Sequence, residues 1–71
     1  MKLVTFQKNN ETTIGWLTTD GGVVDMAKAN SQLPNDMLTF IDNHETYFQI
    51  IKEQNLEQLP ADYTLGEVRL L

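Results

Sequence analysis

The chain has no cysteine and a single histidine, His44, among its 71 residues. Without cysteine it cannot form a disulfide, and one histidine cannot complete a zinc site of the usual nitrogen and sulfur ligands. A domain of about 60 residues buries only about 60% of the surface that its unfolded chain exposes, so its core supplies little net stability. Burial against a partner surface is the remaining source of stability that the sequence indicates.

Charge and hydropathy narrow the possible partners. Ten acidic and five scattered basic residues give a net charge of −5, which argues against nucleic-acid binding. No apolar run approaches the ~20 residues of a membrane span, and residues 1–6 are too short for the apolar core of a signal peptide. We therefore expect one soluble, cytoplasmic domain over residues 1–71 that binds neither nucleic acid nor membranes.

The first half of the sequence predicts three strands joined by tight turns. Residues 2–6 and 12–18 are rich in apolar and β-branched side chains, and the asparagines between them suit a left-handed turn. In the second strand, Ile14 and Trp16 share one face and Gly15 the other. The sequence Asp-Gly-Gly at residues 20–22 predicts the positive φ angles of a primed hairpin turn before a third strand. These three strands are therefore predicted to form an antiparallel meander.

The second half changes from a strand period to a helical one. Residues 26–29 suggest a short helical turn, which ends before Pro34, and Asn35 is placed to cap a new helix. One helical face is then formed by side chains spaced by three and four, namely Met37, Phe40, Ile41, His44, Phe48, Ile51 and Asn55. We expect this helical region to end at residues 59–62.

The helical region contains one expected break, and the chain ends in a strand-like run. Asn43 and His44 interrupt the apolar face, which predicts a bend or break with Glu45 in the first turn of a second segment. Residues 63–71 alternate like a strand and finish on two leucines, which suggests that the chain continues into another element. The predicted fold is α+β: a small antiparallel sheet, made of the meander and a C-terminal strand, with a short helical segment packed on it.

No catalytic or metal-binding residues are predicted. His44 and Glu45 are adjacent, and adjacent helical residues do not face each other, so a packing role for His44 is favoured. The only serine, Ser31, lies in a polar loop without a nucleophile motif. The carboxylates match no metal-ligand loop and suit turns, helix starts or solvated faces: Asp20, Asp25, Asp36, Asp42 and Glu45. The large aromatic residues are expected in the core rather than around a ligand: Phe6, Trp16, Phe40, Tyr47 and Phe48.

Five motifs in order cover nearly the whole chain and carry a family resemblance. They are MKLVTF at residues 1–6, IGWL at 14–17, DGGVVDM at 20–26, LPNDMLTFI at 33–41 and LGEVRLL at 65–71. Together they resemble the N-terminal domain of the bacterial fumarylacetoacetate hydrolase family, which includes acylpyruvate hydrolases and the isomerases of homoprotocatechuate breakdown. Where that family often has glycine after the first helix, this chain has Asn43, and asparagine tolerates the same left-handed cap.

The resemblance implies a division of labour between two domains. In that family a β-rich C-terminal domain holds a divalent metal, usually Mg²⁺, on a Glu-x-Glu pair and a further acidic residue. The metal supports hydrolysis, decarboxylation or isomerisation of 2-oxo and 1,3-dioxo acids. No segment of this chain matches that acidic motif, so the resemblance implies a non-catalytic domain that packs on a catalytic domain absent from this chain. Trp16, Phe40 and Leu70 are the candidate docking residues.

Two other functions are consistent with the sequence. The chain could be a free-standing interaction module, including a homodimer that pairs exposed strands. A minimal enzyme that uses His44 with Glu45 is a more distant alternative.

Overall fold

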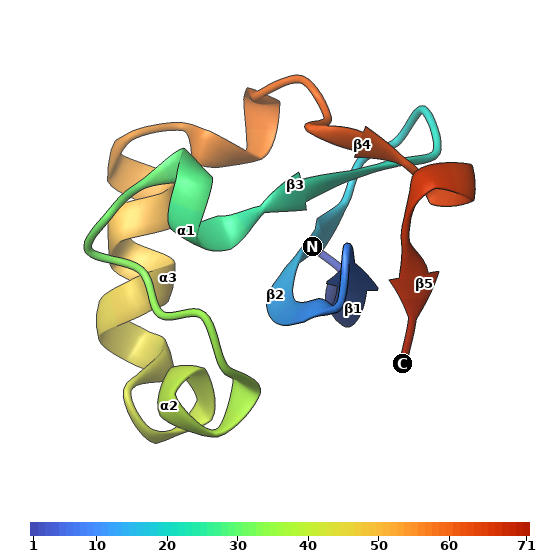
Figure 1. Ribbon diagram of the computed structural model, residues 1–71. Helices are drawn as coiled ribbons and strands as arrows, with labels where there is room; N and C mark the ends of the chain where they lie inside the picture. Colours follow the sequence, from blue (N-terminus) through green and yellow to red (C-terminus); the bar gives the residue numbers. More distant parts are fainter.

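The computed structural model describes all 71 residues and confirms the α+β class, with a curled antiparallel sheet and helices on one side (Figure 1). The strand order is β4-β3-β2-β1-β5, so the first three strands form the predicted meander and the C-terminal segment supplies both edges. The strands are β1 (Leu3–Lys8), β2 (Glu11–Leu17), β3 (Gly22–Asp25), β4 (Tyr63–Thr64) and β5 (Arg69–Leu70).

The β1–β2 hairpin forms as its asparagines predict. Asn9 and Asn10 have φ angles of 53° and 67°, and Lys8 pairs with Glu11 on either side of them. Two consecutive positive φ angles match the twist of the flanking strands, which is the geometry of a type I′ hairpin.

The turn between β2 and β3 differs from the primed hairpin expected at residues 20–22. Only Gly21 has a positive φ, of 87°, whereas Asp20 does not. The loop is longer than two residues, and the Thr18 backbone N–H donates to the Gly22 carbonyl at 2.9 Å. A longer loop reverses the chain with one left-handed residue, so the second positive φ angle is not needed.

Four short helical elements follow β3: α1 (Met26–Ala29), α2 (Met37–Asp42), α3 (His44–Glu53) and the 3₁₀ helix η1 (Leu56–Gln58). The predicted break at Asn43 is confirmed, and Glu45 lies in the first turn of α3. Two details of the prediction are wrong. The cap of α2 is Asp36 rather than Asn35, because the Asp36 carboxylate accepts from the Thr39 backbone N–H at 3.0 Å. Asn43 is not left-handed, with φ −131°; the left-handed residue is Asn55, which turns the chain between α3 and η1.

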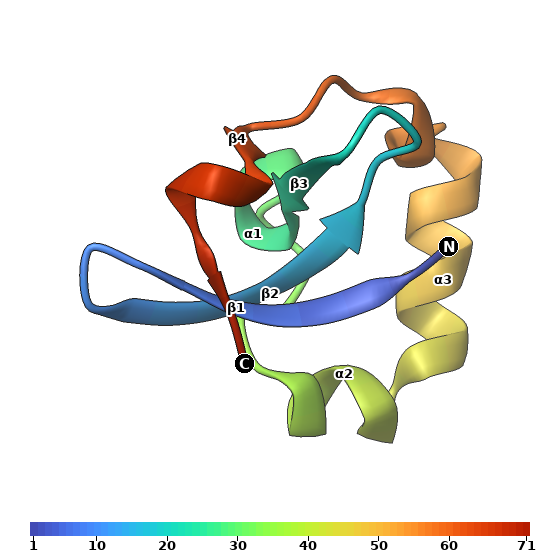
Figure 2. The ribbon, with the colours of Figure 1, turned by 90° about the vertical axis from the view of Figure 1, so that its right-hand side faces the viewer.

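The continuous strand predicted for residues 63–71 is also wrong. It is divided into β4, the 3₁₀ helix η2 (Leu65–Glu67) and β5. Thr64 and Glu67 form a capping box, in which the Thr64 backbone N–H donates to the Glu67 carboxylate at 3.0 Å. This local hydrogen bonding competes with strand pairing, so the segment crosses from one edge of the sheet to the other (Figure 2).

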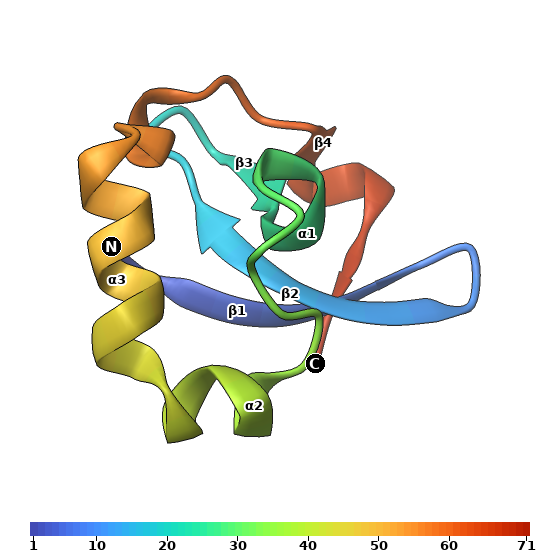
Figure 3. The same ribbon diagram turned by 90° about the vertical axis from the view of Figure 1, so that its left-hand side faces the viewer.

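The core lies mainly between the sheet and the helices, which gather on one face of β1–β3 (Figure 3). Its main cluster consists of Ile14, Trp16, Val24, Met26, Leu33, Phe40, Ile51 and Leu56. Phe6 and Val23 are buried outside this cluster, and the Phe6 ring lies 6.1 Å from the Tyr63 ring, measured between centroids. Because Phe6 is on β1 and Tyr63 on β4, this contact brings together strands that are not neighbours and shows how strongly the sheet curls.

None of the helices has both the length and the apolar character required to cross a lipid bilayer.

Candidate functional site

The three residues predicted to dock a partner do not form one surface. Trp16 and Phe40 are 2% and 1% exposed and belong to the main core cluster. Leu70, on the edge strand β5, is 45% exposed. The core placement predicted for Phe6, Trp16 and Phe40 is confirmed, so Leu70 is the one docking candidate that a partner can contact without opening the core.

The structure also exposes two apolar side chains of α2 that were not candidate docking residues. Leu38 is 76% exposed and Ile41 is 56% exposed, both on α2. Ile41 was expected on the buried face of a longer helical region. The break at Asn43 changes the direction of the chain, so the face of α2 that packs inward is set by Met37 and Phe40 alone.

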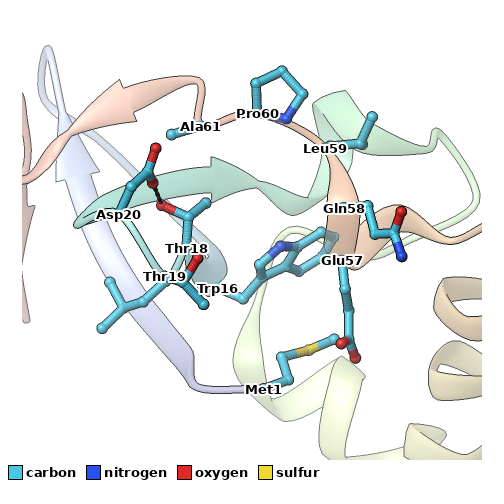
Figure 4. A pocket seen from close by; sticks show the side chains of 11 residues that line it. Met1, Trp16, Thr18, Thr19, Asp20, Glu57, Gln58, Leu59, Pro60 and Ala61 are labelled. Atoms are coloured by element: carbon cyan, nitrogen blue, oxygen red, sulfur yellow. Dashed lines mark hydrogen bonds between the residues drawn. The ribbon is translucent and has the colours of Figure 1, made fainter.

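A cavity of about 500 Å³ lies beside Trp16, between the β2–β3 turn and the segment that follows α3 (Figure 4). Its wall is built from four parts of the chain: Met1, the end of β2 with the following turn, η1, and residues 59–61. The Thr18 hydroxyl, which donates to the Asp20 carboxylate and accepts from the Gly22 backbone N–H, holds the turn in place at one side. The cavity is thus assembled by tertiary structure rather than by any one motif.

The indole nitrogen of Trp16 has no hydrogen-bond partner in the protein, although it is buried. A buried donor without an acceptor costs about 1–3 kcal/mol, so such groups are uncommon in folded proteins. Figure 4 shows the nitrogen on the edge of the ring that faces Thr18 and the Pro60–Ala61 segment. Periodicity places Trp16 in the core but carries no signal that its N–H is unpaired.

A second polar group of side chains surrounds Tyr63 at the curled end of the sheet. Lys28 Nζ donates to the Tyr63 hydroxyl at 3.3 Å, and Lys8 Nζ lies 4.8 Å from the centroid of the Tyr63 ring. The Asp25 backbone N–H donates to the Asp62 carboxylate at 2.8 Å. These contacts join the C-terminal segment to β1, β3 and α1. The group therefore has a structural role.

Asp25 is the member of this group with an unpaired side-chain oxygen. Its Oδ1 atom is buried without a hydrogen-bond partner. Burial, reinforced by the nearby Asp62 carboxylate, raises the pKa of Asp25 above its usual 3.8, although the backbone N–H groups of Lys28 and Ala27 oppose the shift. The ionised form of Asp25 is therefore less favourable in the folded protein than in the unfolded chain.

Asp25→Asn should accordingly stabilise the domain at pH 7. The folded-state pKa is raised, so the cost of ionising Asp25 appears as the pH rises through 3.8 and is complete above the folded-state pKa. Urea unfolding at pH 7 should give a higher midpoint for the variant, and the difference should shrink below pH 3.8. Glu11→Gln, which removes an exposed carboxylate, controls for net charge. A lower midpoint for Asp25→Asn at pH 7 would contradict this interpretation.

His44 has structural partners at the helix break. Its Nδ1 atom lies 3.0 Å from the Ile41 carbonyl oxygen, and its ring lies edge-on to Phe48 with 6.4 Å between centroids. The structure brings no group of three His, Asp or Glu side chains close enough to hold a metal ion.

Comparison with known proteins finds no matching family model, curated protein or solved structure.

Proposed function

We propose that this chain is a non-catalytic domain that packs on, and helps to order, the catalytic domain of a cytoplasmic enzyme similar to the fumarylacetoacetate hydrolases. The five ordered sequence motifs support the family, and the exposed Leu70 on β5 supports the docking role. In such an enzyme the metal-dependent hydrolysis, decarboxylation or isomerisation of 2-oxo and 1,3-dioxo acids belongs to the other domain. Mg²⁺ or a similar ion would then be held there.

The observation that carries the docking role is the position of Leu70 at a sheet edge. Leu70 pairs with Phe6 of β1 on one side only, and both Leu70 and Leu71 keep exposed apolar side chains. A partner that covered these two leucines would bury apolar surface that the small core leaves in water. The resemblance points to the catalytic domain as this partner, because in the family the motif at residues 65–71 leads into that domain.

A homodimer formed by strand pairing is the alternative. The two sheet edges, β4 and β5, are each two residues long. Such short edges offer few unpaired backbone groups, so they are poor templates for a second copy. The edge geometry therefore favours docking through side chains over pairing between copies.

The proposal is tested by adding the chain to the catalytic domain of a bacterial acylpyruvate hydrolase that lacks its own N-terminal domain. We expect a complex in sedimentation, and Leu70→Asp should weaken it about tenfold or more, the effect of losing a dominant interface residue. Leu38→Asp makes the same change at the more exposed Leu38 on α2 and should leave binding intact. The chain alone, with Mg²⁺ and an acylpyruvate, should show no turnover.

Two results would contradict the proposal. One is turnover by the isolated chain that a chelator abolishes. The other is a stable homodimer of the chain that does not bind the catalytic domain at all.

A further inference from the structure

The cavity beside Trp16 has the size of a ligand site. Its volume of about 500 Å³ lies within the range of small-molecule pockets, roughly 300–1,000 Å³. Five of its eleven lining residues are hydrophobic, and the indole of Trp16 forms part of the wall. Leu70, the docking candidate, does not line it. A ligand here is therefore independent of the proposed docking role.

The unpaired Trp16 N–H defines one requirement of the ligand. Indole Nε1 is a donor only, so it can be satisfied only by an acceptor such as a carbonyl or hydroxyl oxygen. Nε1 is itself buried, so a ligand reaches it only by displacing the atoms that cover it. The other polar group near it, the Thr18 hydroxyl, already donates to Asp20.

The charge of the lining defines a second requirement. Among the lining residues, two carry a carboxylate, Asp20 and Glu57, and one carries a positive group, the α-ammonium of Met1. In Figure 4 the two carboxylates lie on different sides of Trp16. The net charge of the whole chain, −5, adds to the same negative field. Anions are therefore disfavoured, whereas a cation gains from either carboxylate and from the face of the indole ring.

We propose that this cavity binds a small organic cation that also carries a hydrogen-bond acceptor, for example an amine joined to an amide through a two-carbon linker. The acceptor oxygen takes the Trp16 N–H, and the ammonium group lies toward the Asp20 or Glu57 carboxylate. The Trp16 N–H has no partner in the folded protein and accepts this contact once the covering atoms move aside, and the apolar lining covers the linking carbons.

The test uses two probes of nearly identical shape, N-(2-aminoethyl)acetamide and N-propylacetamide, which differ in having an ammonium or a methyl group at one end. The chain has one tryptophan, so its ¹⁵N-labelled form gives a single indole N–H resonance that reports directly on Trp16. We expect the cationic probe to shift this resonance in a saturable manner. The neutral probe should bind about two- to fivefold more weakly, because it lacks the ionic contact.

Two variants separate the site from general attraction to an acidic protein. Glu57→Gln should weaken binding of the cationic probe about two- to fivefold, the range for an exposed ion pair, and should leave the neutral probe unaffected. Glu45→Gln removes the same charge from α3 outside the cavity and should have no effect. The proposal is overturned if the indole resonance does not move up to the solubility limit of the probe. Equal binding of both probes, or equal effects of the two variants, would also overturn it.

Discussion

Gly15→Ala should destabilise the domain by about 3 kcal/mol or more, since the new methyl group has no space. A Cβ atom at Gly15 would lie 1.8 Å from the Val24 carbonyl oxygen and 2.9 Å from its carbonyl carbon. Both atoms belong to the backbone of β3, which pairs with β2 at this point, so relief requires the two strands to separate. Marginal domains have roughly 0.05–0.15 kcal/mol of stability per residue, so this change removes a large share of the total.

Urea unfolding followed by the fluorescence of Trp16, the only tryptophan, measures this effect. Gly66→Ala is the matched control, because the nearest heavy atom to its Cβ is Thr64 Oγ1 at 3.9 Å. It should change the free energy of unfolding by less than about 0.5 kcal/mol. Equal midpoints for Gly15→Ala and Gly66→Ala would show that β2 and β3 are not packed as closely as the structure indicates.

Gly15 also illustrates what a sequence can predict about this fold. Strand alternation correctly places Gly15 on the face opposite Ile14 and Trp16, because that pattern depends only on the geometry of one strand. The need for glycine there depends on how closely β3 approaches, which is a property of two segments. The same distinction between local and tertiary features applies to the helices. The break at Asn43 was predictable from the local pattern. The exposure of Ile41 followed only from packing.

The C-terminal segment and the cavity show more clearly what local sequence patterns do not predict. Alternation in residues 63–71 predicts one strand, but the capping box of Thr64 and Glu67 divides it and sends its halves to opposite edges of the sheet. The cavity combines side chains from Met1 to Ala61, and no local signal marks such a set. The Trp16 side chain that lines it has a buried N–H without a partner, which is a property of the folded structure and not of any local motif.

These features place the docking candidate and the ligand candidate on different parts of the molecule. Leu70 lies on β5, at the edge next to β1, whereas the cavity lies at the end of β2 beside η1. A partner domain on Leu70 and a small cation at Trp16 therefore use different surfaces. Each proposal can fail without affecting the other.

Phe40→Ala should cost about 3–5 kcal/mol, the range for truncating a buried phenylalanine. Phe40 is buried in the main cluster, and its ring lies 5.6 Å from Tyr47 and 5.1 Å from Phe48, measured between centroids. Aromatic pairs of this kind contribute beyond the apolar area that they bury. Because α2 has only six residues, it cannot persist as an isolated helix and depends on this anchor.

Leu38→Ala, on the exposed side of the same helix, is the control and should change stability by less than about 0.5 kcal/mol. Two measurements distinguish global from local unfolding. If α2 is part of the cooperative core, Phe40→Ala lowers the urea midpoint reported by Trp16 and amide protection throughout the sheet. If α2 opens separately, amide protection falls in α2 alone and the Trp16 transition is unchanged. We expect the first result, because Phe40 and Trp16 belong to one buried cluster. The second result would show that the helices pack on the sheet less firmly than that cluster implies.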